Sequence, residues 1–155
     1  MISKAEEAAR EYALRLLGKR PYSRRELTDK LTGRGFTSEC AEETVERLAE
    51  AGLQNDADYA ETVVRHYSRK GFGERRIRDE LWRRGIGREL WDGALQEAGT
   101  DENTLGALIK ARLRGGRPDE GEARRVTGWL LRRGYSWDEV RGAMRRYISD
   151  FEDMD

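Results

Sequence analysis

The chain is poor in several residues on which familiar protein chemistry depends. Its 155 residues include one cysteine, one histidine and two prolines. The single cysteine, Cys40, excludes an internal disulfide, and we expect it to be a small, half-buried thiol at the start of a helix. His66 has no other ligand residue at a spacing typical of zinc sites. We therefore expect no bound metal.

Long apolar runs and common enzyme motifs are also missing. No stretch reaches the roughly 18 apolar residues that a bilayer-crossing helix needs, and residues 1–7 lack the apolar core of a signal peptide, so we expect a cytoplasmic protein. There is no glycine-rich phosphate loop and no Gly-x-Ser-x-Gly nucleophile turn. Asp56 and Asp58 lie close together, but N-capping accounts for Asp56 and the helix dipole for Asp58. We expect no enzymatic activity and no cofactor.

The composition favours a thin stack of helices over a large globular core. Hydrophobic residues make up 37% of the chain and charged residues 39%. No alternation of apolar and polar residues predicts a sheet, so the fold class is expected to be all-α. Basic and acidic residues number 30 each, and this zero net charge argues against a protein that binds nucleic acid through positive charge alone.

One short pattern occurs three times. An arginine and a glycine precede a large apolar residue at Arg34-Gly35-Phe36, Arg84-Gly85-Ile86 and Arg133-Gly134-Tyr135, at spacings of 50 and then 49 residues. A fixed period of this size is typical of stacked copies of one helical unit. We predict three tandem three-helix repeats in an elongated stack, with boundaries at residues 1–54, 55–99 and 100–155.

Each copy of the pattern predicts the end of a helix. Glycine tolerates the left-handed conformation that follows many helices, so Gly35, Gly85 and Gly134 fit the position just past the last turn. In the Schellman arrangement the next apolar residue packs on the one five positions earlier. The three expected pairs are Leu31 with Phe36, Leu81 with Ile86, and Leu130 with Tyr135.

Capping signals and glycines set the other boundaries. Ser23 with Glu26, and Ser136 with Glu139, match the capping box that begins a helix. The segment Arg114–Gly121 is rich in glycine, and we expect a long, mobile loop there before a helix over Ala123–Arg133. The third repeat is expected to begin near Thr100-Asp101, and the acidic residues Ser149–Asp155 are expected to fray.

Tryptophans and arginines on the second helix of each repeat are candidates for binding a partner. The repeat register places Trp91 with core residues. Trp129 aligns with Lys30 and Glu80, and Trp82 aligns with Thr32 and Leu131, so both suit either packing between repeats or partner contact. Arg75, Arg78 and Trp82 share one flank of a predicted helix. That flank suits phosphate or an acidic partner, and a plainly solvated face is the alternative.

Several segments resemble the bacterial RecX regulatory family. The first copy carries Lys19–Leu27, Lys30-Leu31 and Arg34-Gly35-Phe36. The second carries Asn55-Asp56, Tyr59-Ala60, Gly71-Phe72-Gly73, Arg76-Ile77, Glu80-Leu81 and Arg84-Gly85-Ile86. The third matches more loosely, through Leu130 and Arg133-Gly134-Tyr135. The resemblance covers about residues 5–148 in order.

The resemblance implies a regulator of the RecA recombinase. Members of the family are elongated, curved molecules of three three-helix units that bind the RecA filament on single-stranded DNA. They limit filament growth, and so depress RecA's ATPase, strand exchange and co-protease activity in DNA repair, recombination and the SOS response. Some also bind DNA.

Arginines of the second helices are the expected contacts, from a concave face that bridges adjacent RecA protomers, and we expect the protein to act as a monomer. The candidate residues are Arg24, Arg25, Arg75, Arg78, Trp82, Arg83, Arg84, Arg124, Arg125 and Arg132. Direct DNA binding without RecA is an alternative, as is a scaffold for another acidic or helical partner.

Overall fold

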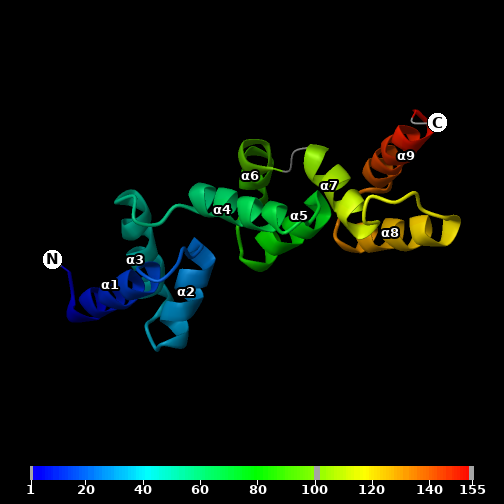
Figure 1. Ribbon diagram of the computed structural model, residues 1–155. Helices are drawn as coiled ribbons and strands as arrows, with labels where there is room; N and C mark the ends of the chain where they lie inside the picture. Colours follow the sequence, from blue (N-terminus) through cyan, green and yellow to red (C-terminus); the bar gives the residue numbers. More distant parts are fainter. Residues whose placement is uncertain (1, 100–101, 154–155) are drawn as a thin grey trace. The chain divides into compact units, whose positions relative to one another are not determined.

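The computed structural model of the protein describes residues 2–99 and 102–153 (Figure 1). Within these residues it has nine α-helices, one short 3-10 turn and no strand, which confirms the all-α fold class. The helices are α1 (Lys4–Leu17), α2 (Arg24–Gly33), α3 (Ser38–Glu50), α4 (Asp56–Arg69), α5 (Glu74–Arg83), the 3-10 turn η1 (Arg88–Leu90), α6 (Trp91–Ala98), α7 (Glu102–Arg112), α8 (Glu120–Arg132) and α9 (Trp137–Asp153). None of these helices is both long and apolar enough to span a bilayer.

The three Arg-Gly patterns end helices α2, α5 and α8 as predicted. Gly35, Gly85 and Gly134 have φ angles of 107°, 74° and 100°, in the region that favours glycine. The N–H of Phe36 donates to the carbonyl of Leu31 at 3.1 Å, and the same bond recurs from Ile86 to Leu81 at 3.1 Å and from Tyr135 to Leu130 at 3.2 Å. Each preceding glycine N–H closes the second bond of the Schellman motif.

Capping follows the predicted boxes at two helices and departs from prediction at a third. The Ser23 hydroxyl accepts from the N–H of Glu26 at 3.0 Å, and Ser136 accepts from the N–H of Glu139 at 3.1 Å. Asp56 was expected to cap α4. The cap is instead Asn55, whose Oδ1 accepts from the N–H of Asp58 at 3.1 Å, because the chain turns into the helix one residue earlier.

The long loop of the third repeat is shorter than the sequence suggested. Helix α8 begins at Glu120 and not at Ala123, because the carboxylate of Asp119 accepts from the N–H of Glu122 at 2.8 Å and closes a capping box. The backbone of this segment takes positive φ at Arg114 and Gly115. Its expected mobility stays a prediction. The hydroxyl of Tyr147 donates to the carbonyl of Gly116 at 2.7 Å and ties the loop to α9.

The other end of the third repeat also differs from expectation. Helix α9 continues through Ser149 to Asp153, so the predicted fraying of that segment is wrong within the described residues. Met154 and Asp155, and the expected starting point at Thr100-Asp101, lie outside them.

By their contacts the described residues form two compact units. The N-terminal unit comprises the chain up to Thr62 together with Leu81–Ala94, and the C-terminal unit comprises Val63–Glu80 together with the chain from Leu95. Helices α4, α5 and α6 each contribute residues to both. The repeat boundaries at residues 54 and 99 follow from the sequence period and stay predictions.

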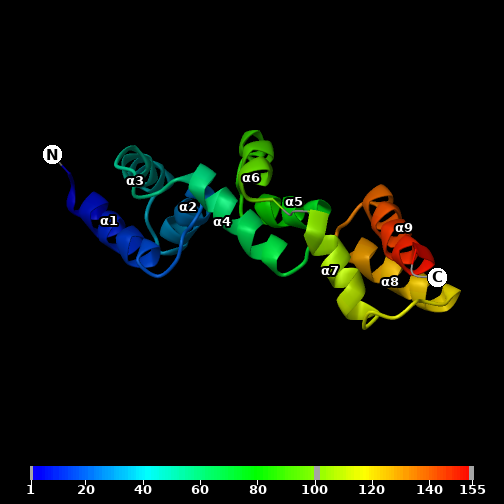
Figure 2. The ribbon, with the colours of Figure 1, turned by 45° about the horizontal axis from the view of Figure 1, so that its top comes forward.

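The N-terminal unit has a core built by α1, α2 and α3, which lie together in Figures 1 and 2. Its buried members are Ala9, Ala13, Tyr22, Leu27, Leu31, Ala41, Val45 and Leu48. Cys40 packs half-buried against this cluster, as expected. Trp91 is also buried, at 6% exposure, and its indole N–H donates to the carbonyl of Ile86 at 3.0 Å.

The C-terminal unit has a second core, between α7, α8 and α9. Helix α9 packs on both of the others (Figure 2). The buried members are Leu105, Ile109, Val126, Leu130, Tyr135, Val140, Ala143 and Met144. These residues recur at helical spacing along each helix, so burial of one apolar face accounts for the packing.

Gly73 allows the start of α5 to approach the end of α8 closely. Its N–H donates to the carbonyl of Arg133 at 2.8 Å. A Cβ on Gly73 would lie 2.4 Å from the backbone nitrogen of Tyr135 and 2.5 Å from the carbonyl carbon of Gly134. Backbone atoms at such distances cannot be avoided by a side-chain rotation, so only glycine fits.

We predict that Gly73→Ala lowers the free energy of unfolding by about 2 kcal/mol or more, because one methyl group overpacks a backbone contact. Urea unfolding followed by circular dichroism measures the loss.

The matched control is Gly93→Ala in α6, where no atom lies within 4 Å of the added Cβ. There the change should raise stability by about 0.5–1 kcal/mol, since alanine is the better helix former. Equal effects of the two changes would contradict the close approach at Gly73.

Candidate interaction surface on the second helices

Helices α2, α5 and α8, the second helix of each repeat, carry nine of the ten predicted partner-binding residues, and the tenth, Arg84, directly follows α5. Seven of the ten are exposed arginines: Arg24, Arg25, Arg75, Arg83, Arg124, Arg125 and Arg132. Arg78 and Arg84 are half-buried. The contacts of each candidate residue show whether its side chain stabilises the fold or faces solvent.

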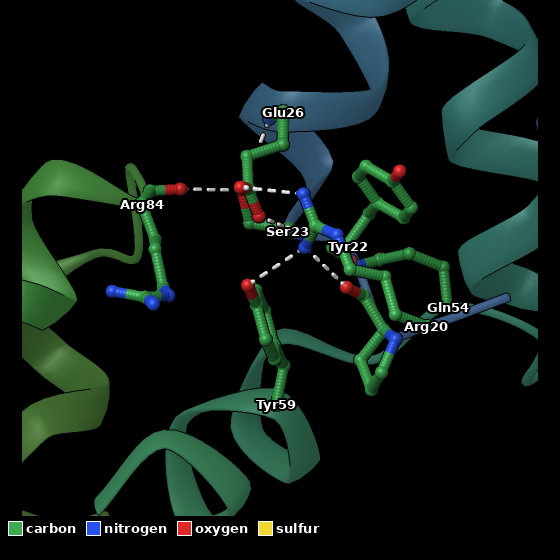
Figure 3. A network of polar contacts seen from close by, with 8 residues as sticks. Arg20, Tyr22, Ser23, Glu26, Gln54, Tyr59 and Arg84 are labelled. Carbon is green, nitrogen blue, oxygen red and sulfur yellow. Dashed lines mark hydrogen bonds and ion pairs between the residues drawn. The ribbon is translucent and has the colours of Figure 1, made fainter. Parts of the chain in front are cut away.

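In the N-terminal unit the start of α2 is bonded to the end of α5. The hydroxyl of Ser23, already the cap of α2, donates to the carbonyl of Arg84 (Figure 3). The side chain of Arg25 covers the turn beside it, because a Cβ on Gly85 would lie 2.4 Å from Cδ of Arg25. Arg25 and Arg84 therefore take part in an internal contact, through an aliphatic stem and a backbone oxygen.

A polar network surrounds this contact (Figure 3). The guanidinium of Arg20 lies 3.6 Å from the ring centre of Tyr22, reaches Glu26 at 3.4 Å, and donates to the hydroxyl of Tyr59 at 3.2 Å. Burial raises the pKa of Tyr59, and the nearby carboxylate of Glu26 adds to the rise. The phenol therefore stays neutral and accepts the hydrogen bond from Arg20 at all ordinary pH values.

Asp56 has a role that the sequence did not indicate. Its carboxylate accepts from the backbone N–H of Arg24 at 3.0 Å and from the amide of Gln54 at 2.6 Å. It therefore places negative charge at the N-terminus of α2, where the helix dipole stabilises it. The side chain of Arg24 forms an ion pair with Glu46 of α3.

In the C-terminal unit the start of α5 is bonded to the end of α8 in the corresponding way. The N–H of Arg75 donates to the carbonyl of Gly134 at 3.1 Å, and its guanidinium donates to the carbonyl of Leu131 at 2.8 Å. Arg75 thus satisfies carbonyl groups that the end of a helix leaves without partners. Arg78, one turn on, forms an ion pair with Glu74 at 2.8 Å.

Arg133 is the largest omission of the sequence-based site prediction. It was not among the candidate contact residues. Its guanidinium donates to the carbonyls of Gly71 at 3.0 Å and of Lys70, just past the end of α4. It also lies 4.1 Å from the ring centre of Phe72 and 5.0 Å from that of Trp129. Arg133 therefore caps the turn that ends α4, 62 and 63 residues earlier in the chain, while packed on two aromatic rings.

Helix α8 leaves its remaining arginines to solvent. Arg124, Arg125 and Arg132 make no hydrogen bond or ion pair with another described residue. Arg125 is close enough to Asp119 to help lower the pKa of that carboxylate, although hydrogen bonds from Glu122 are the main cause. These three arginines are the ones best placed to meet an external anion.

The tryptophans fall into three environments. Trp82 of α5 is 66% exposed, so packing between repeats does not explain it. Trp129 is half-buried against the C-terminal core, where Arg112 and Arg133 lie over its ring. Trp137, at the start of α9, is 55% exposed. Among the predicted residues Trp82 alone is a large exposed apolar side chain.

Nothing in the described part of the chain suggests a metal centre, since it holds no group of three or more metal-ligating side chains.

Comparison with known proteins gives consistent matches. Residues 9–48 match the model of the first three-helix domain of RecX, and residues 55–95 match that of the second. The regulatory protein RecX of Halorhodospira halophila is 40% identical over 150 residues, which is 96% of this chain and 93% of the relative. That of Stenotrophomonas maltophilia is 37% identical over 90% of this chain and 87% of its own.

Solved structures agree in fold. The crystal structure of RecX from Lactobacillus salivarius superimposes with a TM-score of 0.82 at 21% identity, over 92% of this chain and 96% of that one. A second crystal structure of a regulatory protein RecX gives a TM-score of 0.76 at 22% identity, over 91% of this chain and 72% of that one.

We predict that Arg133→Lys lowers the free energy of unfolding by about 1–3 kcal/mol, because an ammonium group cannot donate to two carbonyls and stack on two rings at once. Thermal or urea unfolding measures the change.

Arg132→Lys is the matched control. Arg132 is the neighbouring residue, and its guanidinium is exposed and makes no such contacts. Its effect should stay within about 0.5 kcal/mol. If Arg133→Lys were equally mild, the capping role assigned to Arg133 would be wrong.

Proposed function

Because the chain belongs to the RecX family of regulatory proteins, we propose that it binds the filament that RecA forms on single-stranded DNA and depresses RecA activity. Its relatives are named regulatory proteins, and this chain is likewise a regulator and not an enzyme. Its proposed targets are RecA's ATPase, strand exchange and co-protease functions. We place this activity in the cytoplasm, in recombinational DNA repair and the SOS response.

One observation supports the α8 arginines as contacts. Arg124, Arg125 and Arg132 project from one helix without internal partners, although the chain has as many acidic residues as basic ones. An exposed guanidinium without an internal ion pair keeps its hydrogen-bond donors available to a partner, and arginine suits both carboxylate and phosphate groups. A nucleoprotein filament offers both.

The arginines of α5 and α2 contribute less than the sequence suggested. Arg75 and Arg78 donate to groups of this chain, and Arg24 is ion-paired with Glu46. Reversing their charge would disturb the fold together with any interface. Trp82 is the better probe of α5, because exposed tryptophan is over-represented among the residues that dominate binding energy.

We expect the purified protein to inhibit the DNA-dependent ATPase of RecA well below one molecule per RecA, whatever the excess of single-stranded DNA. The experiment holds RecA fixed and varies both the protein and the DNA. Inhibition that excess DNA abolishes would instead mean competition for the strand, which is direct DNA binding. No effect at any ratio would contradict the proposal.

Trp82→Ala should raise the concentration needed for half-inhibition by about tenfold or more, as for a central interface residue. Its circular dichroism and unfolding midpoint should not change, since the side chain is largely in solvent. Trp137→Ala is the matched control: an equally simple truncation of an exposed tryptophan, on a helix outside the proposed contacts. Equal inhibition by both variants would remove α5 from the interface.

Arg124→Glu with Arg125→Glu should weaken inhibition by at least about tenfold, because opposed like charges replace attraction at the contact. Arg141→Glu with Arg145→Glu makes the same change of net charge on exposed positions of α9. A similar loss in both double variants would mean that total charge matters and that α8 is not a specific contact.

A further inference from the structure

The turn after helix α7 has an arginine at a position where comparable turns have glycine. Five other helices end in the Schellman pattern of hydrogen bonds, and their residues of positive φ are Gly35, Gly52, Gly71, Gly85 and Gly134. The end of α7 has the same pattern: the N–H of Gly115 donates to the carbonyl of Lys110 at 2.9 Å, and that of Arg114 donates to the carbonyl of Ala111 at 3.3 Å. The residue of positive φ is here Arg114, at 55°.

Arg114 is an unfavourable choice for this turn. A left-handed φ brings the Cβ of an L-residue close to the following carbonyl oxygen, and glycine avoids this clash. Arginine also lacks the short polar side chain with which asparagine compensates. Among the described residues, Arg114 is the one residue other than glycine that has a positive φ. A strained residue at a position where glycine would be more stable indicates that its side chain serves a function.

Arg114 also lies in a run of cations that contains no acid. Residues 103–118 include Lys110, Arg112, Arg114 and Arg117 and no aspartate or glutamate. The first three are exposed, and their side chains make no hydrogen bond or ion pair with another described residue. The helix dipole accounts for cations in the last turn of α7, where Lys110 and Arg112 lie. It does not account for a cation at the one position that strains the backbone.

Two neighbouring helices position this turn. The hydroxyl of Tyr147 in α9 donates to the carbonyl of Gly116 at 2.7 Å, two residues beyond Arg114. The guanidinium of Arg112 lies 4.4 Å from the ring centre of Trp129 in α8. A guanidinium stacked on an aromatic ring keeps the N–H donors at its edge available to an anion. Because these contacts restrict the turn, less conformational entropy is lost when an anion binds.

We propose that Arg114, together with Lys110 and Arg112, binds the phosphodiester backbone of the single-stranded DNA in the filament. This site rests on the proposed function, because the filament supplies the strand. It lies at the end of α7 and is additional to the contacts expected from the second helices α2, α5 and α8.

The lack of apolar side chains around the turn favours DNA over an acidic protein surface. The exposed large apolar residues of the described chain are Ile2, Leu14, Leu53, Trp82 and Trp137, and none of them belongs to residues 103–118. The centre of a protein–protein interface is apolar and poor in charge, whereas lysine and arginine bind phosphates without apolar contacts. The acid that follows the run, Asp119, is engaged as the cap of α8.

Two measurements on the full chain test the site. Arg114→Gly should raise the unfolding midpoint by about 2–4 °C, because it relieves the backbone strain. At low salt the same change should weaken binding of a fluorescent deoxythymidine oligonucleotide by at least about fivefold. It should also lower the slope of log affinity against log salt by about 0.7, the value for one phosphate contact on a single strand. Arg114→Lys should keep the wild-type midpoint, and its affinity should stay within about threefold because the charge remains.

Arg141→Ala is the control, since it removes one positive charge from an exposed position of α9. Its affinity for the oligonucleotide should stay within about twofold of wild type. Equal losses in Arg141→Ala and Arg114→Gly would mean that net charge alone matters, and would overturn the site. An unchanged midpoint in Arg114→Gly, or a wild type that does not bind the oligonucleotide, would overturn it as well.

The RecA ATPase assay separates the remaining outcomes. If Arg114→Gly lost inhibition of RecA but kept its affinity for the oligonucleotide, the turn would bind an acidic protein surface and the DNA site would be wrong. The DNA-binding measurement contains no RecA. A wild type that binds the oligonucleotide but leaves RecA uninhibited would therefore contradict the proposed function and support the site.

Discussion

Carbonyl groups at the ends of helices are the feature on which the rest of this molecule depends. Each Arg-Gly turn stops its helix and leaves carbonyls that the helix itself cannot satisfy. At the ends of α5 and α8 those carbonyls accept from the start of the preceding second helix, through Ser23 in one unit and through Gly73 and Arg75 in the other. One backbone device, used twice, joins the start of one second helix to the end of the next.

The same kind of contact gives several charged residues a structural role. In a chain with 39% charged residues, some arginines stabilise the fold through hydrogen bonds to backbone carbonyls and packing on aromatic rings. Arg133 and Arg75 are examples: both satisfy backbone oxygens that water would otherwise have to reach. Other arginines, among them Arg124, Arg125 and Arg132 of α8, make no such contact and stay exposed.

The sequence predicted what is local and missed what is distant. The Schellman turns at Gly35, Gly85 and Gly134 depend on six neighbouring residues, so the pattern alone was sufficient. The cap that Arg133 provides for α4 joins groups 62 residues apart. Aligning the repeats compares only equivalent positions, so it could not reveal this contact. The error at the start of α8 was of a different kind. Asp119 and Glu122 have the spacing of a capping box, but they lie in a glycine-rich segment that was predicted to be a loop.

That early start of α8 sets a limit on how the array can be lengthened. Helices α2 and α5 begin three residues before Leu27 and Ile77, whereas α8 begins six residues before the equivalent Val126. The additional residues are Glu120–Glu122. They occupy the positions at which the starts of α2 and α5 donate hydrogen bonds to the Arg-Gly turn of the next repeat. A gene duplication that copied this repeat in tandem would yield a unit unable to accept its neighbour until those residues were lost.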